Sequence, residues 1–285
     1  MKPGVYTDIS NNDYHTSAGY SSTTIKKFLN QTPASILFEK TNKPKDDKPA
    51  YSLGSAVHSL ILEPEKFDDD FAVTGNWNLR TNLGKETRDR FVAENQGKII
   101  ITPEDYAQAR MMANSVLDHP MSSACLTGTK NENSIFWKED FESREVEGLN
   151  LEILLKVRPD AISTDYPIIY DIKTCKSAAY KDFQKDIVNF GYHISAAMYL
   201  KGVNSCEEFT NQKFYDSFCF ICVEKEPPYQ VAVYELDPEF LRIGAMFFNK
   251  ALERLALALH YDWPTYPESI RIMEPPKWAN LLPLI

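Results

Sequence analysis

The feature that most constrains the fold is a pair of strand-like segments in the middle of the chain, residues 150–157 and 167–173. In the first, apolar residues recur at alternate positions, and the second, Pro-Ile-Ile-Tyr-Asp-Ile-Lys, also has the composition of a strand. A Ser-Thr-Asp-Tyr-Pro segment between them is typical of a turn. We therefore predict an antiparallel hairpin that places Asp160 beside Asp171. Asp171 and Lys173 are two residues apart, so their side chains leave the strand on the same face.

Two carboxylates and an ammonium group on one sheet face form a candidate catalytic site. Carboxylate oxygens are ligands that Mg²⁺ and Mn²⁺ prefer, and a lysine can orient or deprotonate a water and stabilise charge on a phosphate. An isolated Asp-x-Lys is more often a solvated ion pair. Here Pro159-Asp160 precedes Asp171-Ile172-Lys173, and this pattern resembles the PD-(D/E)xK nuclease superfamily. The resemblance implies an α/β, restriction-endonuclease-like core with a mixed central sheet flanked by helices.

Residues 51–64 have the apolar spacing of an amphipathic helix, with a stripe at Leu53, Val57, Leu60 and Ile61. Gly54 and His58 are four residues apart and are therefore neighbours on one side of this helix. A glycine one turn before a histidine leaves room above the imidazole for a ligand or metal. A lone histidine in such a helix is more often a hydrogen-bonded core residue. Because the candidate aspartates occur in the same chain, we predict that His58 is a metal ligand.

The composition limits the class of protein. With 285 residues, 43% hydrophobic and 25% charged, the chain can bury a large core. No repeat or low-complexity linker divides it, so we predict a single domain over residues 1–285. No long apolar run or signal-peptide core is present, which predicts a cytoplasmic protein without a membrane span. The net charge of −9 argues against a simple basic DNA-binding module, but bound metal can reverse the sign at a nuclease site.

The five cysteines, an odd number without a disulfide framework, suit a reducing compartment. Cys219 and Cys222 form a CxxC pattern within an apolar, strand-like run. Residues three apart on a strand face opposite sides. We therefore interpret both as core thiols rather than as a metal or redox pair.

The peripheral segments carry weaker signals. Residues 1–20 are predicted to form an irregular N-terminal arm, and residues 261–285 an irregular C-terminal tail. Residues 65–100 are interpreted as loop-rich, with Arg80 and Lys85 as candidate contacts to DNA phosphates. An ordinary surface loop is the alternative.

Two helices are predicted within residues 178–202, separated by a break at Gly191. In the second helix Tyr192, Ser195 and Tyr199 share one face through their i, i+3, i+7 spacing. Either that face packs on the sheet beside the site, or it touches the DNA backbone.

Over nearly its whole length the sequence resembles the RecE-type exonucleases, the catalytic domain of exodeoxyribonuclease VIII. The matching segments are residues 51–65, 79–85, 158–174, 191–199, 262–264 and 276–279. The resemblance implies a Mg²⁺-dependent exonuclease, with Mn²⁺ as a substitute ion. Such an enzyme degrades the 5′-ended strand of linear double-stranded DNA and leaves a 3′ overhang. It also implies a RecT-type single-strand annealing partner for DNA recombination and repair, often in phage, and a ring-shaped homotetramer.

By position, the resemblance implies a catalytic and metal-binding set that consists of His58, Asp160, Asp171, the backbone carbonyl of Ile172, and the catalytic Lys173. Two Mg²⁺ about 4 Å apart would flank the scissile phosphate, shared by the aspartates. The predicted DNA contacts are Arg80, Lys85, Arg158, Ser195 and Tyr199. The chain departs from the superfamily at Ser195, where a glutamine is often found four residues before a tyrosine, because serine is too short to span the same distance.

Two rival functions remain open. The same fold could serve an endonuclease, which would cut closed circles that an exonuclease spares. The chain could also be a catalytically inactive DNA-binding or assembly protein, although all the candidate ligand and lysine positions are present.

Overall fold

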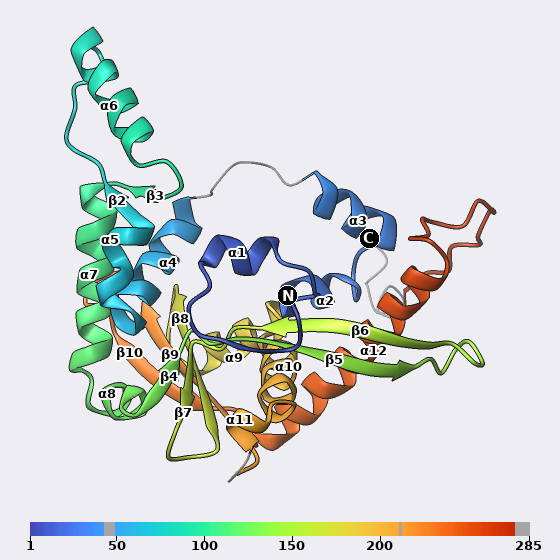
Figure 1. Ribbon diagram of the computed structural model, residues 1–285. Coiled ribbons are helices and arrows are strands. Elements are labelled where there is room, and N and C mark those ends of the chain that lie inside the picture. The colour runs from blue at the N-terminus through green and yellow to red at the C-terminus, as the bar shows by residue number, and fades with distance from the viewer. Residues whose placement is uncertain (43–48, 211–212, 277–285) are drawn as a thin grey trace, which may run out of the picture.

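The computed structural model describes residues 1–42, 49–210 and 213–276 (Figure 1). The strands are β1 Gly4–Tyr6, β2 Phe71–Val73, β3 Ile99–Ile101, β4 Thr129–Asn131, β5 Ser134–Glu142, β6 Asn150–Val157, β7 Ala161–Ser163, β8 Ile168–Cys175, β9 Ser217–Glu224 and β10 Val231–Glu235. The longer helices are α3 Pro33–Thr41, α4 Pro49–Leu62, α6 Asn82–Glu94, α7 Pro103–Asp118, α9 Tyr180–Asn189, α10 Tyr192–Asn204 and α12 Pro238–His260. Shorter helical segments are α1 Asn11–Thr16, α2 Ser22–Lys27, η1 Pro64–Lys66, α5 Phe67–Asp70, α8 Pro120–Leu126 and α11 Glu207–Thr210.

The central sheet has five strands in the order β10-β9-β8-β7-β4. β8 and β9 are parallel, whereas the other neighbouring pairs are antiparallel. The chain between β8 and β9 forms α9, α10 and α11, so the parallel pair is joined by a helical crossover. The sheet is therefore mixed and flanked by helices, which confirms the predicted fold class.

β9 separates two apolar cores by the alternation of its side chains. Phe218, Phe220 and Cys222 pack in the core that includes residues of α9, α10 and α12. Cys219, Ile221 and Val223 pack in the second core, with residues of α4 and α7. The result is a helix–sheet–helix arrangement, visible in Figure 1. Cys219 and Cys222 are both buried, free and on opposite faces, as the sequence predicted.

A long bent hairpin leads into the central sheet. β5 pairs with β6, and β4 pairs with β7, in one continuous register in which Ile135 lies opposite Val157 and Asn131 opposite Ala161. Between these two ladders, regular pairing is interrupted at residues 132–133 and 158–160. The interruption lies where the hairpin leaves the central sheet, and it places polar side chains there.

The N-terminal segment is not irregular, contrary to the prediction. β1 pairs antiparallel with β5, and α1 begins at the Ser10 cap, whose hydroxyl accepts a hydrogen bond from Asp13 N. Tyr14 is buried against Phe136 on β5. Three residues are too few to show an alternating strand pattern, and β1 exists because β5 offers it an open edge.

Lys156 on β6 anchors this N-terminal segment from a buried position. Its ammonium group donates hydrogen bonds to the carbonyl oxygens of Tyr14 (2.6 Å) and Ser17 (2.8 Å). Lys156 is only 4% exposed, so these bonds are shielded from water. The segment that covers the end of the hairpin is therefore held by a charge-assisted contact.

The Lys156→Met variant is expected to lose about 2–4 kcal/mol of unfolding free energy, because two carbonyl groups lose their charged donor while the aliphatic packing is kept. Urea unfolding followed by circular dichroism measures the change. Lys138→Met on neighbouring β5 is the control, since the Lys138 side chain is half exposed, and its stability should change by less than about 0.5 kcal/mol. Equal stability of the two variants would contradict the anchoring role.

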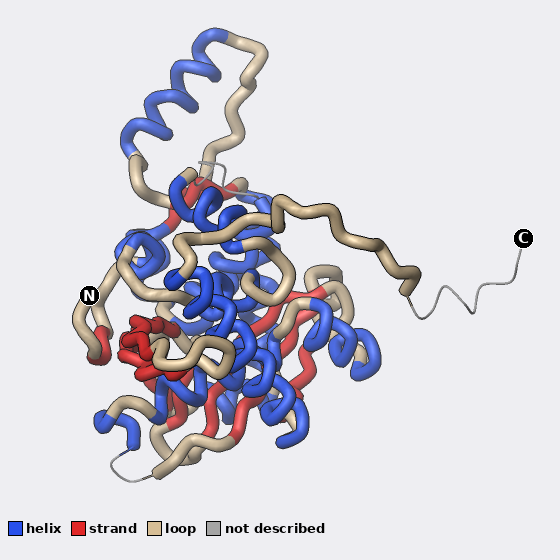
Figure 2. The backbone as a smooth tube through the Cα atoms, turned by 90° about the vertical axis from the view of Figure 1, so that its right-hand side faces the viewer, coloured by secondary structure: helices blue, strands red, loops and turns tan. Residues whose placement is uncertain are grey.

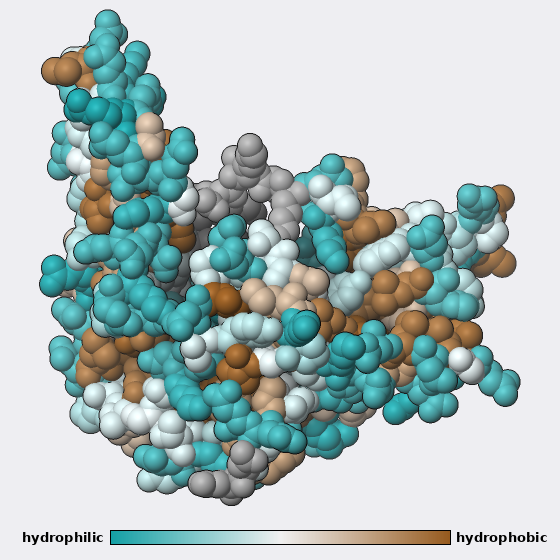
Figure 3. Space-filling view, in the orientation of Figure 1, coloured by the Kyte–Doolittle hydropathy of each residue, from teal (hydrophilic) through white to brown (hydrophobic). Residues whose placement is uncertain are grey.

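Residues 65–100 are more regular than predicted. They contain α5, β2, α6 and β3, and β2 pairs in parallel with β3. Thr81 caps α6, because its hydroxyl accepts a hydrogen bond from Gly84 N (3.0 Å). α6 projects from the body as an arm (Figures 1 and 2), and its surface is largely hydrophilic (Figure 3). A helix with so little apolar surface has no strong period, which explains why the sequence indicated loops.

Residues 261–276 form no helix or strand, as predicted, and residues 264–276 are exposed. The rest of the predicted tail, including most of residues 276–279, lies outside the described residues. Within the part of the chain that is described, no helix is both long and apolar enough to span a bilayer.

Candidate active site

Asp171 and Lys173 on β8 form the centre of the site. Their side chains leave the same face of the strand, as predicted, and the Lys173 ammonium makes an ion pair with the Asp171 carboxylate. Asp171 is only 4% exposed, so this ion pair is largely shielded from water. The ring of Tyr192, at the start of α10, lies beside it, with its centroid 5.3 Å from Lys173 Nζ.

Asp160 lies immediately before β7 and is fixed by the backbone of β8. In the β7–β8 register Ala161 is opposite Tyr170, so Asp160 comes opposite Asp171. Its Oδ2 accepts a hydrogen bond from Ile172 N at 2.6 Å. The hairpin geometry predicted from the sequence is thus confirmed. Lys173 Nζ lies 3.5 Å from the Ile172 carbonyl oxygen, which places that carbonyl beside the same group.

His58 approaches this pair from α4. Its Nδ1 lies 3.6 Å from Asp160 Oδ2, and its side chain is 27% exposed. The ring therefore faces the carboxylate and is not a core histidine, the alternative considered above. Val57 and Ile61 are buried and hold α4 against the sheet. Gly54 faces Thr174 of β8. A Cβ at Gly54 would lie 3.6 Å from Thr174 Oγ1, which is an ordinary van der Waals contact.

Glu132 was missed by the sequence analysis. It lies in the interruption between β4 and β5, opposite Asp160, and its backbone N–H donates to the Asp160 carbonyl (3.0 Å). Its φ of 49° is in the left-handed region, which is uncommon for glutamate. The side-chain ligand atoms of His58, Glu132 and Asp160 all lie within 4.8 Å of one another. The only local signal was the Asn131-Glu132-Asn133 run that breaks a strand.

Burial and mutual repulsion shape the charges of the site. Burial raises the pKa of Asp171 to about 6, with a further contribution from Asp160, against the opposing effect of Lys173. Burial and the Asp160 charge raise the pKa of Glu132 well above its usual value. Burial lowers the pKa of Lys173, but the charges of Asp171 and Asp160 outweigh it and raise the pKa overall. Lys173 is therefore a stable ammonium group.

These residues fit a divalent cation. Three carboxylates and an imidazole converge, and one lysine does not balance their negative charge. Carboxylate and carbonyl oxygens suit Mg²⁺ and Mn²⁺, and an imidazole suits Mn²⁺ better than Mg²⁺. Asp160 connects α4 with β8, because its carboxylate lies beside His58 and accepts a hydrogen bond from the β8 backbone.

A second lysine borders the site. Lys26 on α2 donates a hydrogen bond to the Phe190 carbonyl oxygen (3.0 Å), and its Nζ lies 6.0 Å from the Tyr192 ring centroid. Burial and the charge of Lys173 lower the pKa of Lys26 to about 8. This side of the site is therefore cationic, in contrast to the acidic side.

The predicted DNA contacts are dispersed. Arg80 precedes α6 and Lys85 lies in its first turn, so both belong to the projecting arm. Arg158 is half-buried and donates to Ser134 Oγ (2.6 Å) and to the Ile9 carbonyl oxygen (3.0 Å), so it holds the N-terminal segment.

On α10, Ser195 is half-buried, and Tyr199 packs against Phe218 of β9 with ring centroids 6.2 Å apart. Burial, followed by the charges of Asp171 and Asp160, raises the pKa of Tyr199. Of the two orientations left open by the sequence, the structure therefore shows that Tyr192 and Tyr199 pack on the sheet beside the site.

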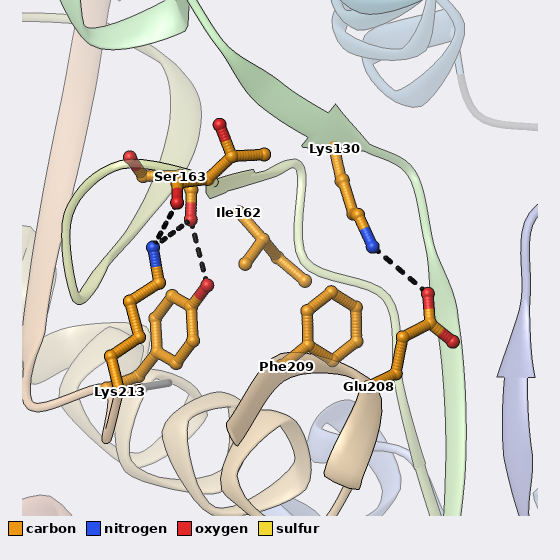
Figure 4. A pocket seen from close by; sticks show the side chains of 8 residues that line it. Lys130, Ile162, Ser163, Glu208, Phe209 and Lys213 are labelled. Carbon is orange, nitrogen blue, oxygen red and sulfur yellow. Dashed lines mark hydrogen bonds and ion pairs between the residues drawn. The ribbon is translucent and has the colours of Figure 1, made fainter. Parts of the chain in front are cut away.

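A cavity of about 310 Å³ lies away from these residues, beside β4 and β7 (Figure 4). Its lysines are engaged, because Lys130 pairs with Glu208 and Lys213 donates to the Ser163 and Thr164 carbonyl oxygens. None of the acidic residues of the candidate active site lines this cavity.

A mixed sheet that presents an aspartate at a strand end and Asp-x-Lys on the next strand defines a PD-(D/E)xK-type core. The chain belongs to the family described as PDDEXK-like domain of unknown function (DUF3799), which matches residues 21–275. This match agrees with the superfamily resemblance found in the sequence. No curated protein matches the chain.

Solved structures give a more distant likeness. A protein from Eubacterium rectale, provisionally described as an exonuclease, is 14% identical, with 96% of this chain and 98% of that chain covered and a TM-score of 0.57. This likeness shows a shared fold. The alkaline exonuclease LHK-Exo from Laribacter hongkongensis is 11% identical, with 85% and 90% covered, but its TM-score of 0.23 is too low to support an argument.

Proposed function

We propose that this protein is a divalent-metal-dependent deoxyribonuclease that resects the 5′-ended strand of linear double-stranded DNA and leaves 3′ single-stranded overhangs. The observation that carries the proposal is the meeting of His58, Asp160, Asp171 and Lys173, which lie on α4, before β7 and on β8. A surface ion pair does not explain an imidazole and a second buried carboxylate that come from other elements, whereas a divalent cation bound for phosphodiester hydrolysis does.

In the proposed reaction, water attacks the phosphorus atom and loses a proton to solvent, while the bond to the leaving oxygen of the DNA strand breaks and that oxygen takes up a proton from solvent. Bound at the carboxylates, His58 and the Ile172 carbonyl, Mg²⁺ or Mn²⁺ would supply positive charge that stabilises the phosphate as negative charge develops. Lys173, held by Asp171, donates a hydrogen bond that orients the attacking water. The Ile172 N–H fixes the Asp160 carboxylate in one orientation. Tyr192 shields one side of the lysine from bulk water.

The finer parts of this proposal are supported by the sequence resemblance. They are the 5′ polarity, delivery of the overhang to a single-strand annealing protein for recombination and repair, a ring-shaped tetramer, and a cytoplasmic location. The role of Arg80, Lys85 and Ser195 as contacts to DNA belongs to the same proposal, whereas Tyr199 packs against Phe218 of the sheet. Arg158 would act through the N-terminal segment that it holds, since its donors are engaged there.

The test is digestion of linear duplexes labelled separately at the 5′ and 3′ ends, with Mg²⁺ or with EDTA. The 5′ label should be released early and the 3′ label retained, with no release in EDTA, and covalently closed circles should survive. Linearised circles would indicate an endonuclease of the same fold. No cleavage of any DNA by a protein that binds Mg²⁺ would overturn the enzymatic proposal.

A further inference from the structure

We infer that Glu132 is a cation ligand and that it builds, with His58 and Asp160, a position separate from the one shared by Asp160 and Asp171. This inference deepens the proposed function and rests on it for its purpose. It concerns a residue that neither the superfamily pattern nor the sequence analysis assigns.

The geometry carries the inference. His58, Glu132 and Asp160 each offer a ligand atom, and all these atoms lie within 4.8 Å of one another. His58 comes from α4, and Glu132 and Asp160 come from the two sides of the interruption in the bent hairpin. The Glu132 N–H bond to the Asp160 carbonyl (3.0 Å) fixes the two acidic residues opposite each other. Two carboxylates and an imidazole on rigid elements form a set of donors suited to one cation.

The Glu132 carboxylate has no other use in the structure. Within residues 1–42, 49–210 and 213–276, its oxygens make no hydrogen bond or ion pair, although Glu132 is half-buried. The carboxylate of Glu63, another acidic residue nearby, does have a partner, because it forms an ion pair with Lys66 at 2.7 Å. A carboxylate that is partly removed from water and has no partner is costly unless a positive charge meets it.

Asp171 belongs to the other position. Its carboxylate is engaged by Lys173, and it is absent from the close group that includes Glu132. Asp160 joins the two positions, because its Oδ2 accepts from Ile172 N and also lies 3.6 Å from His58 Nδ1. The position with the imidazole should favour Mn²⁺ over Mg²⁺, because nitrogen ligands bind Mn²⁺ more readily.

A structural role for Glu132 is the rival explanation. Arg158 contributes a favourable charge, and Glu132 could serve only to hold the interruption of the hairpin. The two roles differ in one measurable respect. A structural residue affects the stability of the metal-free protein, whereas a ligand affects the gain in stability that the metal brings.

The experiment uses the full chain, stripped of metal and free of DNA, titrated with Mn²⁺ in a calorimeter. Wild type and the control Glu63→Gln should bind two Mn²⁺, whereas Glu132→Gln should bind one, or bind the second at least about tenfold more weakly. Unchanged binding by Glu132→Gln, or a single Mn²⁺ in wild type, would overturn the inference.

Thermal unfolding separates the rival role. In EDTA, Glu132→Gln should melt close to wild type, and in Mn²⁺ it should lose part of the stabilisation seen in wild type. A lowered melting temperature in EDTA with an unchanged Mn²⁺-induced gain would assign Glu132 a structural role and overturn the inference. Because no DNA is present, a protein that fails to cleave DNA can still pass this test, so the two proposals fail separately.

Discussion

The Lys173→Ala variant is expected to lose DNA cleavage by about 10³-fold or more, because the ammonium group beside Asp171 is the donor placed to orient water and stabilise charge on the phosphate. Initial rates of label release from linear duplex DNA in Mg²⁺ measure the loss. Mn²⁺ binding, measured by calorimetry without DNA, should persist because the acidic ligands remain. Loss of the rate with retained binding would locate the defect in the chemical step.

The matched control is Lys176→Ala, the same substitution three residues further along the chain. Lys176 is exposed, so its removal should change the rate by less than about twofold. Both variants must show the wild-type circular dichroism spectrum, since Lys173 also neutralises a buried carboxylate. A folded Lys173→Ala protein that cleaves at the wild-type rate would refute the catalytic assignment.

The Gly244→Ala variant is expected to lower the unfolding free energy by about 3 kcal/mol and to reduce cleavage as well. A Cβ at Gly244 would lie 2.1 Å from the His193 carbonyl oxygen, so α12 and α10 could not pack as they do. The clash is with the backbone of His193, which cannot rotate out of the way as the end of a flexible side chain can. Since α10 begins at Tyr192, its displacement should also reduce cleavage. Denaturant unfolding and the rate assay measure the two effects.

The control for this variant is Gly54→Ala, which also adds a methyl group to a helix. Its Cβ would make only an ordinary contact of 3.6 Å with Thr174 Oγ1. The expected result is unchanged stability or a gain of up to about 1 kcal/mol, because alanine favours helix more than glycine does. If Gly54→Ala were as destabilising as Gly244→Ala, the clash with the His193 backbone would not be the cause.

Local periodicity predicted much of the core correctly. The alternation along β9 placed Cys219 and Cys222 on opposite faces, and the structure has them in different cores. The helical spacing of residues 51–64 placed Gly54 and His58 on one side of α4, and in the structure the His58 ring faces Asp160. Gly191, with φ of 62°, breaks the helix between α9 and α10 where expected, because glycine tolerates this conformation.

Elements that depend on a partner were not predictable. β1 has three residues and forms because β5 has a free edge. The projecting α6 lacks an apolar face, so its residues showed no period. Arg158 was predicted to contact DNA, but nothing local to it revealed that Ser134 and Ile9 would take up its donors.

The sequence by itself determined that Asp171 and Lys173 share a face and that Asp160 lies opposite Asp171, because strand geometry and a short turn fix both. Only the tertiary structure decided that Glu132 joins His58 and Asp160. That meeting depends on the register of a hairpin about thirty residues long and on how α4 packs against the sheet. Contacts between distant segments are set by the packing of whole elements, which no local pattern of residues records.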